Sequence, residues 1–338
     1  MIDMKRKKKK LKLKSNVKLI LFVLVVLICI IAFANKKYQE YLYTKTSEYA
    51  LLQLGYTEDE VKIFQKKMNE DTLWYVVNNI KYSEFLSHFA ECKYFIPKNI
   101  DAYLSKTVTK DQDFWHYKEA DQYDYDSIIA KVNTKVIYDQ YTNTTATDMS
   151  KGYGILVNKY YYLASDYSPE DLVDVPWKYR FGGANDKIYI RNDAYEAFLE
   201  MWNDAQEAGF YLLIDSGFRN YQDQETIYNQ YANKSGISYA DTIAARPGFS
   251  EHQTGLAIDL YSKQNSSAST FSKSEVYAWL IKNCYKYGFI LRYPEGKSKL
   301  TGYNFESWHY RYVGKDLAKK VVDSGLTFDE YYAYYLDK

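Results

Sequence analysis

The chain has 338 residues, which is enough for one large domain with accessory segments or for two small domains. Hydrophobic residues make up 47% of it and charged residues 26%, as in an ordinary folded globular protein. The net charge of +1 hides an asymmetry, because residues 1–18 carry nine basic groups and one acid, whereas the remainder carries 35 basic and 42 acidic residues. This distribution excludes a basic surface spread over the whole chain, and we expect no nucleic-acid partner.

An apolar segment follows the basic run. Residues 19–34, LILFVLVVLICIIAFA, contain no charge and would span about 24 Å as a helix, a little short of the ~30 Å hydrocarbon core of a bilayer. Nine basic residues precede this segment and only Lys36 and Lys37 follow it closely, which places the N-terminus inside the cell and the body outside. We therefore predict a cytoplasmic tail (1–18), a single-pass membrane anchor (19–34) and an extracytoplasmic body.

A cleaved signal peptide is the alternative to a retained anchor. Ala32-Phe33-Ala34 fits the small-residue pattern of a cleavage site, so that cleavage near Ala34 would release a secreted protein. The apolar run is slightly long for a signal peptide, which favours the anchor. Either outcome exports the body.

Residues 35–150 are interpreted as a helical spacer and accessory region. Thr57 and Glu60 form the signature of a capping box, and Val61, Phe64 and Met68 then recur at helical spacing. A second helical run covers residues 83–95. From about residue 126 the pattern turns β-rich, and we expect strands at residues 127–132 and 135–138.

The main domain is predicted at residues 151–338, after a polar stretch at 142–150. The strands expected there are residues 155–157, 210–214, 256–260 and 308–313, and the helices are residues 192–208, 276–287 and a segment beginning at 221–231. This order of segments predicts an α+β fold with a mainly antiparallel sheet.

Two of the four histidines lie in the stretches that most resemble functional motifs. The first stretch is residues 246–260, RPGFSEHQTGLAIDL. In a strand over residues 256–260, Ala257 and Asp259 point away from the core, so that Asp259 faces a cavity beside a small residue. His252 would lie on the opposite face of a straight strand, but Thr254-Gly255 offers a break that can fold it back beside Asp259.

The second stretch is residues 306–314, ESWHYRYVG, in which His309 alternates with aromatic residues and can face the same cavity. Two histidines and one aspartate leave a fourth tetrahedral position for water, as in catalytic zinc sites. We predict one zinc ion per chain, held by His252, Asp259 and His309. Glu306 is placed to accept a proton from water and to pass it to a departing amine. Each of these residues alone would more often be structural, and the joint pattern is what favours a site.

The motifs resemble those of VanY-type D-alanyl-D-alanine carboxypeptidases, in the zinc peptidase group that includes lysostaphin and the Hedgehog domain. Ser250-x-His252-x-x-Gly255-x-Ala257-x-Asp259 and Glu306-x-Trp308-His309 carry the resemblance, together with residues 216–224, 287–294 and 301–303. It covers about residues 153–325. It departs from the family pattern at Ser307, where the family usually has proline, which bears on the rigidity of the Glu306 loop but not on the ligand set.

The resemblance implies a Hedgehog/D,D-peptidase-like zinc fold with helices on one side of the sheet. It gives the same three zinc ligands, Glu306 as catalytic base, and Arg219 as a catalytic and substrate-binding group. A planar guanidinium can hold a carboxylate or an oxyanion through two parallel hydrogen bonds. Gln224 and Ser250 are further substrate-binding candidates, whereas Arg246 and Arg292 are interpreted as structural.

The reaction implied is hydrolysis of the terminal D-Ala of peptidoglycan stem peptides. An endopeptidase that cuts inside a stem peptide or a cross-bridge is an alternative, because loops set the depth of the pocket. A zinc-containing binding module without turnover is a second alternative, and the presence of Glu306 argues against it.

Overall fold

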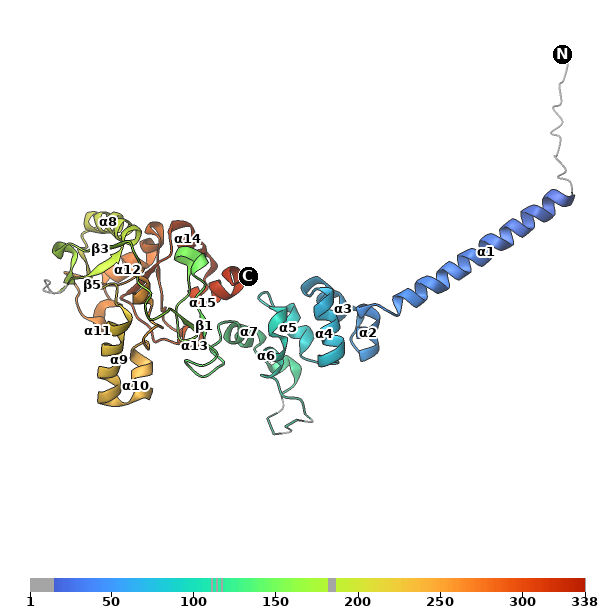
Figure 1. Cartoon of the computed structure of the whole chain (residues 1–338), viewed down its shortest axis with the longest axis horizontal. Helices are drawn as coiled ribbons and strands as arrows, with labels where there is room; N and C mark the ends of the chain where they lie inside the picture. Colours follow the sequence, from blue (N-terminus) through green and yellow to red (C-terminus); the bar gives the residue numbers. More distant parts are fainter. Residues whose placement is uncertain (1–14, 111, 114, 117, 182–186, 338) are drawn as a thin grey trace, which may run out of the picture. The chain divides into compact units, whose positions relative to one another are not determined.

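The computed structural model describes residues 15–110, 112–113, 115–116, 118–181 and 187–337 (Figure 1). Most of the predicted basic tail therefore lies outside the described residues. The chain divides into two compact units, residues 1–91 and 92–338. The domain boundaries drawn from the sequence stay predictions, and the structure adds that residues 92–150 belong to the same unit as the main domain.

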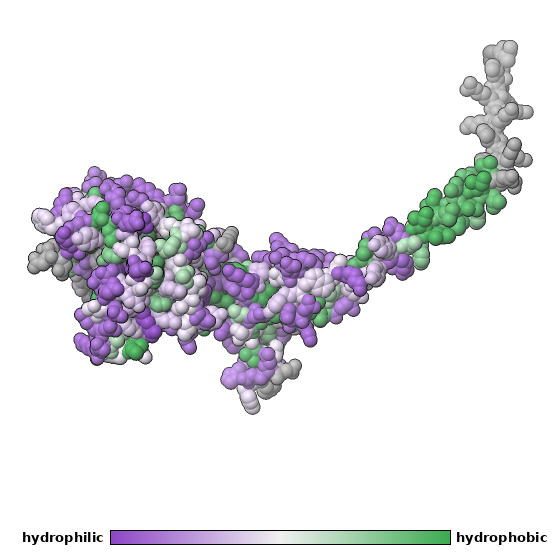
Figure 2. Space-filling model, viewed as in Figure 1, coloured by the Kyte–Doolittle hydropathy of each residue, from purple (hydrophilic) through white to green (hydrophobic). Residues whose placement is uncertain are grey.

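Helix α1 (Ser15–Tyr43) contains the predicted anchor. Its segment Val17–Tyr43 is long and apolar enough to cross a membrane, and its most apolar part is not buried in the protein. Figure 2 shows hydrophobic surface along this helix. A signal sequence near an N-terminus has the same length and composition, so the helix is compatible with both interpretations.

Short helices form the rest of the first unit. They are α2 (Ser47–Leu54), α3 (Glu58–Lys67), α4 (Glu70–Tyr75), a π-helical turn (Val76–Ile80) and α5 (Leu86–Glu91). The capping box predicted at Thr57 and Glu60 is present, with both reciprocal hydrogen bonds formed. Val61, Phe64 and Met68 are buried as their helical spacing predicts.

The second unit begins with helices and short strand pairs. These are α6 (Ile100–Leu104), α7 (Tyr125–Asn133), the parallel pair β1 (Thr145–Ala146) and β2 (Tyr161–Tyr162), and the antiparallel pair β3 (Leu172–Asp174) and β4 (Tyr189–Arg191).

A four-stranded antiparallel sheet of order β5-β6-β8-β7 lies at the centre of this unit. Its strands are β5 (Leu212–Ser216), β6 (Ala257–Ser262), β7 (Phe289–Leu291) and β8 (His309–Tyr312). The remaining helices are α8 (Asn192–Glu207), α9 (Tyr221–Ser235), α10 (Ile237–Ile243), α11 (Ala268–Phe271), α12 (Glu275–Asn283), α13 (Ser298–Thr301), α14 (Lys315–Ser324) and α15 (Phe328–Tyr331). The predicted α+β class with a mainly antiparallel sheet is confirmed.

The two faces of the sheet have different roles. Ile258, Leu260 and Tyr310 point into one buried hydrophobic cluster together with residues of α8 and α12. Asp259 and His309 alternate with these residues and therefore point to the opposite face. At the β7 edge that opposite face is packed by α14 and α15 through a second cluster that contains Ile290. The open part of the face is where the predicted site lies.

Three strand predictions are wrong. Residues 127–132 lie in α7, where the Asp124 side chain caps the helix and Ile129 is buried at helical spacing. Residues 135–138 form turns, and residues 155–157 form no strand. Around residues 155–157, the carbonyls of Tyr153 and Ile155 accept hydrogen bonds from the Arg311 guanidinium rather than from the backbone of a neighbouring strand.

Candidate active site

Two neighbouring strands bring the first pair of predicted ligands together. Asp259 on β6 lies directly opposite His309 on β8 in the antiparallel register. The two side chains contact each other, with His309 Nδ1 at 3.0 Å from Asp259 Oδ1. Strand alternation thus places both residues on the same face, as the sequence predicted.

His252 reaches this pair through a break in the chain. It lies in a 3₁₀ turn, Glu251–Thr254, which ends at Gly255 in the left-handed conformation (φ 66°). His252 Nδ1 is 2.7 Å from the carbonyl oxygen of Gly217, which directs Nε2 toward Asp259 Oδ2 at 3.4 Å. The turn at Gly255 therefore folds His252 back beside Asp259, as the sequence predicted.

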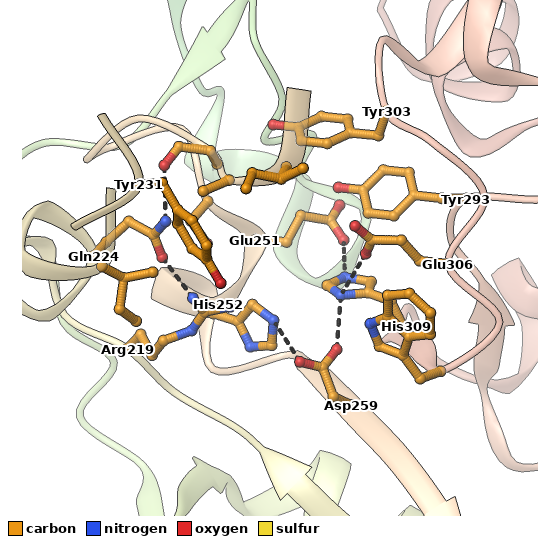
Figure 3. Close-up of a pocket in the computed structure, with 16 residues that line it drawn as sticks. Arg219, Gln224, Tyr231, Glu251, His252, Asp259, Tyr293, Tyr303, Glu306 and His309 are labelled. Atoms are coloured by element: carbon orange, nitrogen blue, oxygen red, sulfur yellow. Dashed lines mark hydrogen bonds and ion pairs between the residues drawn. The ribbon is translucent and has the colours of Figure 1, made fainter. Parts of the chain in front are cut away.

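The three side chains fit a metal ion. His252 Nε2 faces Asp259 Oδ2 and His309 Nδ1 faces Asp259 Oδ1, and ligand atoms of the three residues lie within 4.8 Å of one another (Figure 3). The outer nitrogen of each imidazole faces an acceptor, the Gly217 carbonyl for His252 and Glu251 for His309. Such outer partners orient the imidazoles of metal sites.

The charges of the cluster also suit a cation. Burial lowers the pKa of His252 to about 4, so its imidazole is neutral as a ligand must be. Burial alone would lower the pKa of His309, but hydrogen bonds to Asp259 and Glu251 outweigh it and raise the pKa to about 9. Burial alone would raise the pKa of the Asp259 carboxyl, but the two imidazoles hold this pKa well below its usual range. The carboxylates of Asp259 and Glu251 thus favour a positive charge beside His309.

Glu306 lies beside the cluster, in the loop that leads into β8. Its Oε2 is 3.7 Å from His309 Nδ1, and its backbone N–H donates to the Tyr293 carbonyl. Burial raises the pKa of Glu306 to about 7, an effect that the neighbouring Asp259 supports and His309 opposes. A carboxyl group in this position can exchange protons near neutral pH.

Arg219 faces the cluster from the segment between β5 and α9. Its Nη1 donates to Gln224 Oε1 at 2.9 Å, and Gln224 Nε2 donates to the Ala245 carbonyl at 2.7 Å. Arg219 Nε is buried and has no hydrogen-bond partner among the described residues. An unpaired guanidinium N–H beside a cation site is suited to binding an anionic group.

These residues line one cavity of about 190 Å³. Aromatic and aliphatic side chains from α9, α10 and the loops before β8 complete its walls: Ile227, Tyr231, Ile243, Tyr293, Tyr303 and Trp308. Every predicted site residue lines this cavity, Ser250 included, and their individual roles stay predictions.

Glu251 was missed by the sequence analysis. Its side chain is fully buried, with Oε1 accepting from Arg292 Nε (2.7 Å) and Arg311 Nη1 (2.9 Å) and Oε2 at 3.4 Å from His309 Nε2. The two guanidinium groups hold the pKa of Glu251 well below its usual range despite burial. Arg292 also pairs with Asp329 on α15. The sequence offered one indication of this buried acid. Arg311 lies two residues after His309 and therefore on the same strand face, and a buried arginine requires a buried acid as its partner.

Comparisons with known proteins agree with this geometry. The family model for VanY, D-alanyl-D-alanine carboxypeptidase, matches residues 187–315. The bifunctional D-Ala-D-Ala dipeptidase and D-Ala-D-Ala carboxypeptidase VanXYC of Enterococcus gallinarum is 30% identical over 183 residues, which cover 53% of this chain and 93% of that protein. The chain belongs to the VanY family.

Two further relatives extend the comparison. The Bacillus subtilis protein YodJ is 41% identical over 179 residues, covering 52% of this chain and 66% of YodJ, so the match spans less than two thirds of that relative. The solved structure of the LdcB LD-carboxypeptidase is 37% identical to this VanY-family chain, with a TM-score of 0.54, and the match covers 57% of this chain and 91% of that one. The segment before residue 187, including Tyr141 and Lys159, lies outside the match to the family model.

Proposed function

We propose that the chain is a zinc-dependent D-alanyl-D-alanine carboxypeptidase that removes the terminal D-Ala of peptidoglycan stem peptides outside the membrane. The observation that carries this proposal is the arrangement in one cavity of a cation site, a buried carboxyl group and an arginine with a free N–H. Membership of the VanY family supports the same reaction.

His252, Asp259 and His309 would hold the zinc ion. Two imidazole nitrogens and a carboxylate are ligands that zinc prefers, and three protein ligands leave a position open for catalysis. Zinc in such a site polarises a carbonyl group and lowers the pKa of water.

Glu306 and Arg219 would carry the proton and the substrate. Glu306 takes a proton from the attacking water and delivers it to the amine of the departing D-Ala. Arg219, held by Gln224, binds the terminal carboxylate of the peptide or the oxygen that gains charge during attack.

An L,D-carboxypeptidase is the second candidate, favoured by the likeness to LdcB. Both reactions release a C-terminal D-Ala, and they differ in the residue that precedes the bond. The side chains of Ile227, Tyr231 and Ile243 line the cavity, and we infer that this apolar part of the wall helps to select the residue before the bond.

For the location, we propose that α1 is retained as a membrane anchor and that the catalytic unit faces the cell wall. Support comes from the nine basic residues before the apolar segment and from the exposed apolar surface of the helix.

Defined muropeptides test the reaction. Full-length protein in detergent, loaded with zinc, should convert a pentapeptide ending in D-Ala-D-Ala to the tetrapeptide, and mass spectrometry should detect the loss of one alanine. Preferential loss of alanine from the tetrapeptide would indicate the L,D activity, and cleavage of a cross-linked dimer would indicate an endopeptidase. No cleavage of any of the three would contradict the proposal.

His309→Ala tests the metal site in the same assay. It should lose most of the bound zinc and the activity, because it removes one of three ligands. A fully active preparation without metal would rule out the zinc site.

A further inference from the structure

The wall of the cavity formed by α10 and the following loop is supported by a segment outside the family match. Ile243, Ala244 and Ala245 line the cavity, and the nearby residues Asp241 and Arg246 contact the segment 139–160. The link consists of two side chains, Tyr141 and Lys159, which the mechanism does not use. Their backbones are also joined, because the Tyr141 N–H donates to the Lys159 carbonyl at 3.2 Å.

Tyr141 holds the chain directly after Ala245. Its hydroxyl oxygen accepts from the backbone N–H of Arg246 at 3.3 Å, its ring lies 4.3 Å from the Arg246 guanidinium, and it makes an edge contact with Phe249. Tyr141 adopts a left-handed backbone conformation (φ 62°), which is unfavourable for a bulky residue. Such strain persists only where the surrounding contacts enforce it.

Lys159 holds the helix itself. Its ammonium group is almost completely buried and donates to the backbone carbonyl of Asp241 on α10 (2.7 Å) and to Gln140 Oε1 (2.9 Å). It also lies 4.8 Å from the ring of Tyr303, which lines the cavity. Burial lowers the pKa of Lys159 to about 8, so the group remains mostly charged at neutral pH.

Asp241 connects these contacts to both helices of the wall. Its carboxylate accepts two hydrogen bonds from the Arg246 guanidinium (2.9 and 2.8 Å) and one from Tyr228 of α9 (2.8 Å). The path from the segment to the site is therefore continuous. Tyr141 fixes Arg246, the adjacent Ala245 carbonyl orients the Gln224 amide, and Gln224 orients Arg219.

We propose that Tyr141 and Lys159 are positioning residues for the reaction, which support the substrate-binding wall of the peptidase from outside the cavity. They act through α10 and the Ala245 carbonyl to hold Arg219 in the orientation that binds the substrate carboxylate. This inference rests on the proposed function, and it extends the functional unit to a segment that the family model does not include.

Tyr141→Phe and Lys159→Met test the proposal in the full-length, zinc-loaded protein. Tyr141→Phe removes one hydrogen-bond acceptor and keeps the ring, and Lys159→Met removes the ammonium group and keeps most of the aliphatic volume. Of the two groups named above for Arg219, we assign it the terminal carboxylate. Because this carboxylate is present in the ground state and the transition state alike, KM for the D-Ala-D-Ala pentapeptide should rise about three- to tenfold while kcat stays within about twofold. Zinc content should be unchanged.

Thr147→Val is the matched control in the same segment. Thr147 is buried and its hydroxyl donates to the Leu156 carbonyl at 2.9 Å, so the substitution also removes one buried hydrogen bond. It should lower the melting temperature by a similar amount and leave KM unchanged. Equal KM values for wild type, Tyr141→Phe and Lys159→Met would overturn the proposal.

Amide hydrogen exchange decides the question independently of turnover. Peptides that cover residues 241–250 should exchange faster in Tyr141→Phe and Lys159→Met than in wild type or Thr147→Val. If the wild type hydrolyses no peptide, the proposed function fails, whereas unchanged exchange over residues 241–250 would refute the positioning role whatever the activity.

Discussion

At the scale of single residues, the predicted metal ligands and the predicted base occupy different positions in the cavity. The three predicted ligands face one another, whereas Glu306 lies at the side, 3.7 Å from the nearest ligand atom of His309. We therefore expect substitutions to alter metal binding and proton transfer independently.

Glu306→Gln tests the role of the base. Glutamine keeps the size and hydrogen-bonding reach of the side chain but cannot accept a proton. Turnover should fall by about 10²–10⁴-fold while zinc remains bound, because the three ligands are untouched. Zinc content, melting temperature and rate should be measured together on this variant. Loss of zinc with the activity would make Glu306 a fourth ligand, and near wild-type turnover would refute the mechanism.

Glu251→Gln tests the buried acid behind His309. The substitution leaves Arg292 and Arg311 with one fewer compensating charge, which should destabilise the fold by about 3–5 kcal/mol in urea unfolding. It also removes a charged acceptor for His309 Nε2, so zinc affinity should weaken about 10–100-fold in competition with a chelator.

The exposed pair of Glu200 and Lys315 provides the comparison for Glu251. Glu200→Gln breaks an ion pair at the surface and should change stability by less than about 1 kcal/mol, with zinc affinity unaffected. Unaltered zinc affinity in Glu251→Gln would show that the acid contributes to the fold only.

At the scale of elements, the site depends on the junction between a 3₁₀ turn and β6. Gly255 takes a left-handed conformation there, and a β-carbon would lie 2.9 Å from Arg191 Cγ and 3.0 Å from Leu172 Cδ2. The junction therefore has two independent reasons to require glycine. Because this junction sets the position of His252, we expect a substitution at Gly255 to weaken metal binding.

Gly255→Ala should lower both stability and zinc affinity. The left-handed conformation alone costs about 1–2 kcal/mol for a residue with a β-carbon, and the close contacts add to this. Gly296→Ala is the matched control, since Gly296 has a similar φ of 75° but nothing within 4 Å of the added carbon. It should show the conformational cost without loss of zinc. Equal unfolding and zinc-binding curves for the two variants would contradict this account of the junction.

At the scale of the whole molecule, the chain combines an apolar helix near its N-terminus with an acidic body. The positive charge is concentrated in residues 1–18, before the apolar part of α1. This distribution is typical of a protein that is inserted with its N-terminus in the cytoplasm.

Fractionation of cells tests the anchor. Full-length protein should be found in the membrane fraction, and external protease should degrade the body in cells without a wall. N-terminal sequencing provides the decisive measurement, because a mature protein in the medium that begins at Asn35 would show a cleaved signal peptide instead.

Local patterns in the chain were sufficient to predict the fold class and the side chains that the structure brings into one cavity, while the roles of these side chains stay predictions. Strand alternation placed Asp259 and His309 on one face, and a glycine next to a short polar run predicted the return of His252. Alternation within a strand and a break at a glycine depend on residues close in sequence, and the physical rules that govern them have periods of only a few residues. The pairing of Asp259 with His309, in contrast, joins strands whose residues lie 50 positions apart. The same local reading failed for residues 127–132, where β-branched side chains lie on the buried face of a helix.

The supports behind the site were decided by contacts between distant segments. Arg292 pairs with Asp329 thirty-seven positions later, and Asn158 reaches Asp329 across 171 positions. Tyr141 reaches Arg246 across 105 positions. A buried ion pair or a single tyrosine hydroxyl has no periodicity in the chain, so nothing local distinguishes such residues from surface ones. Only the folded structure brings a charge and its counter-charge together. Burial makes an unpaired charge costly, and the attraction of a well-placed partner in the low-dielectric interior offsets that cost.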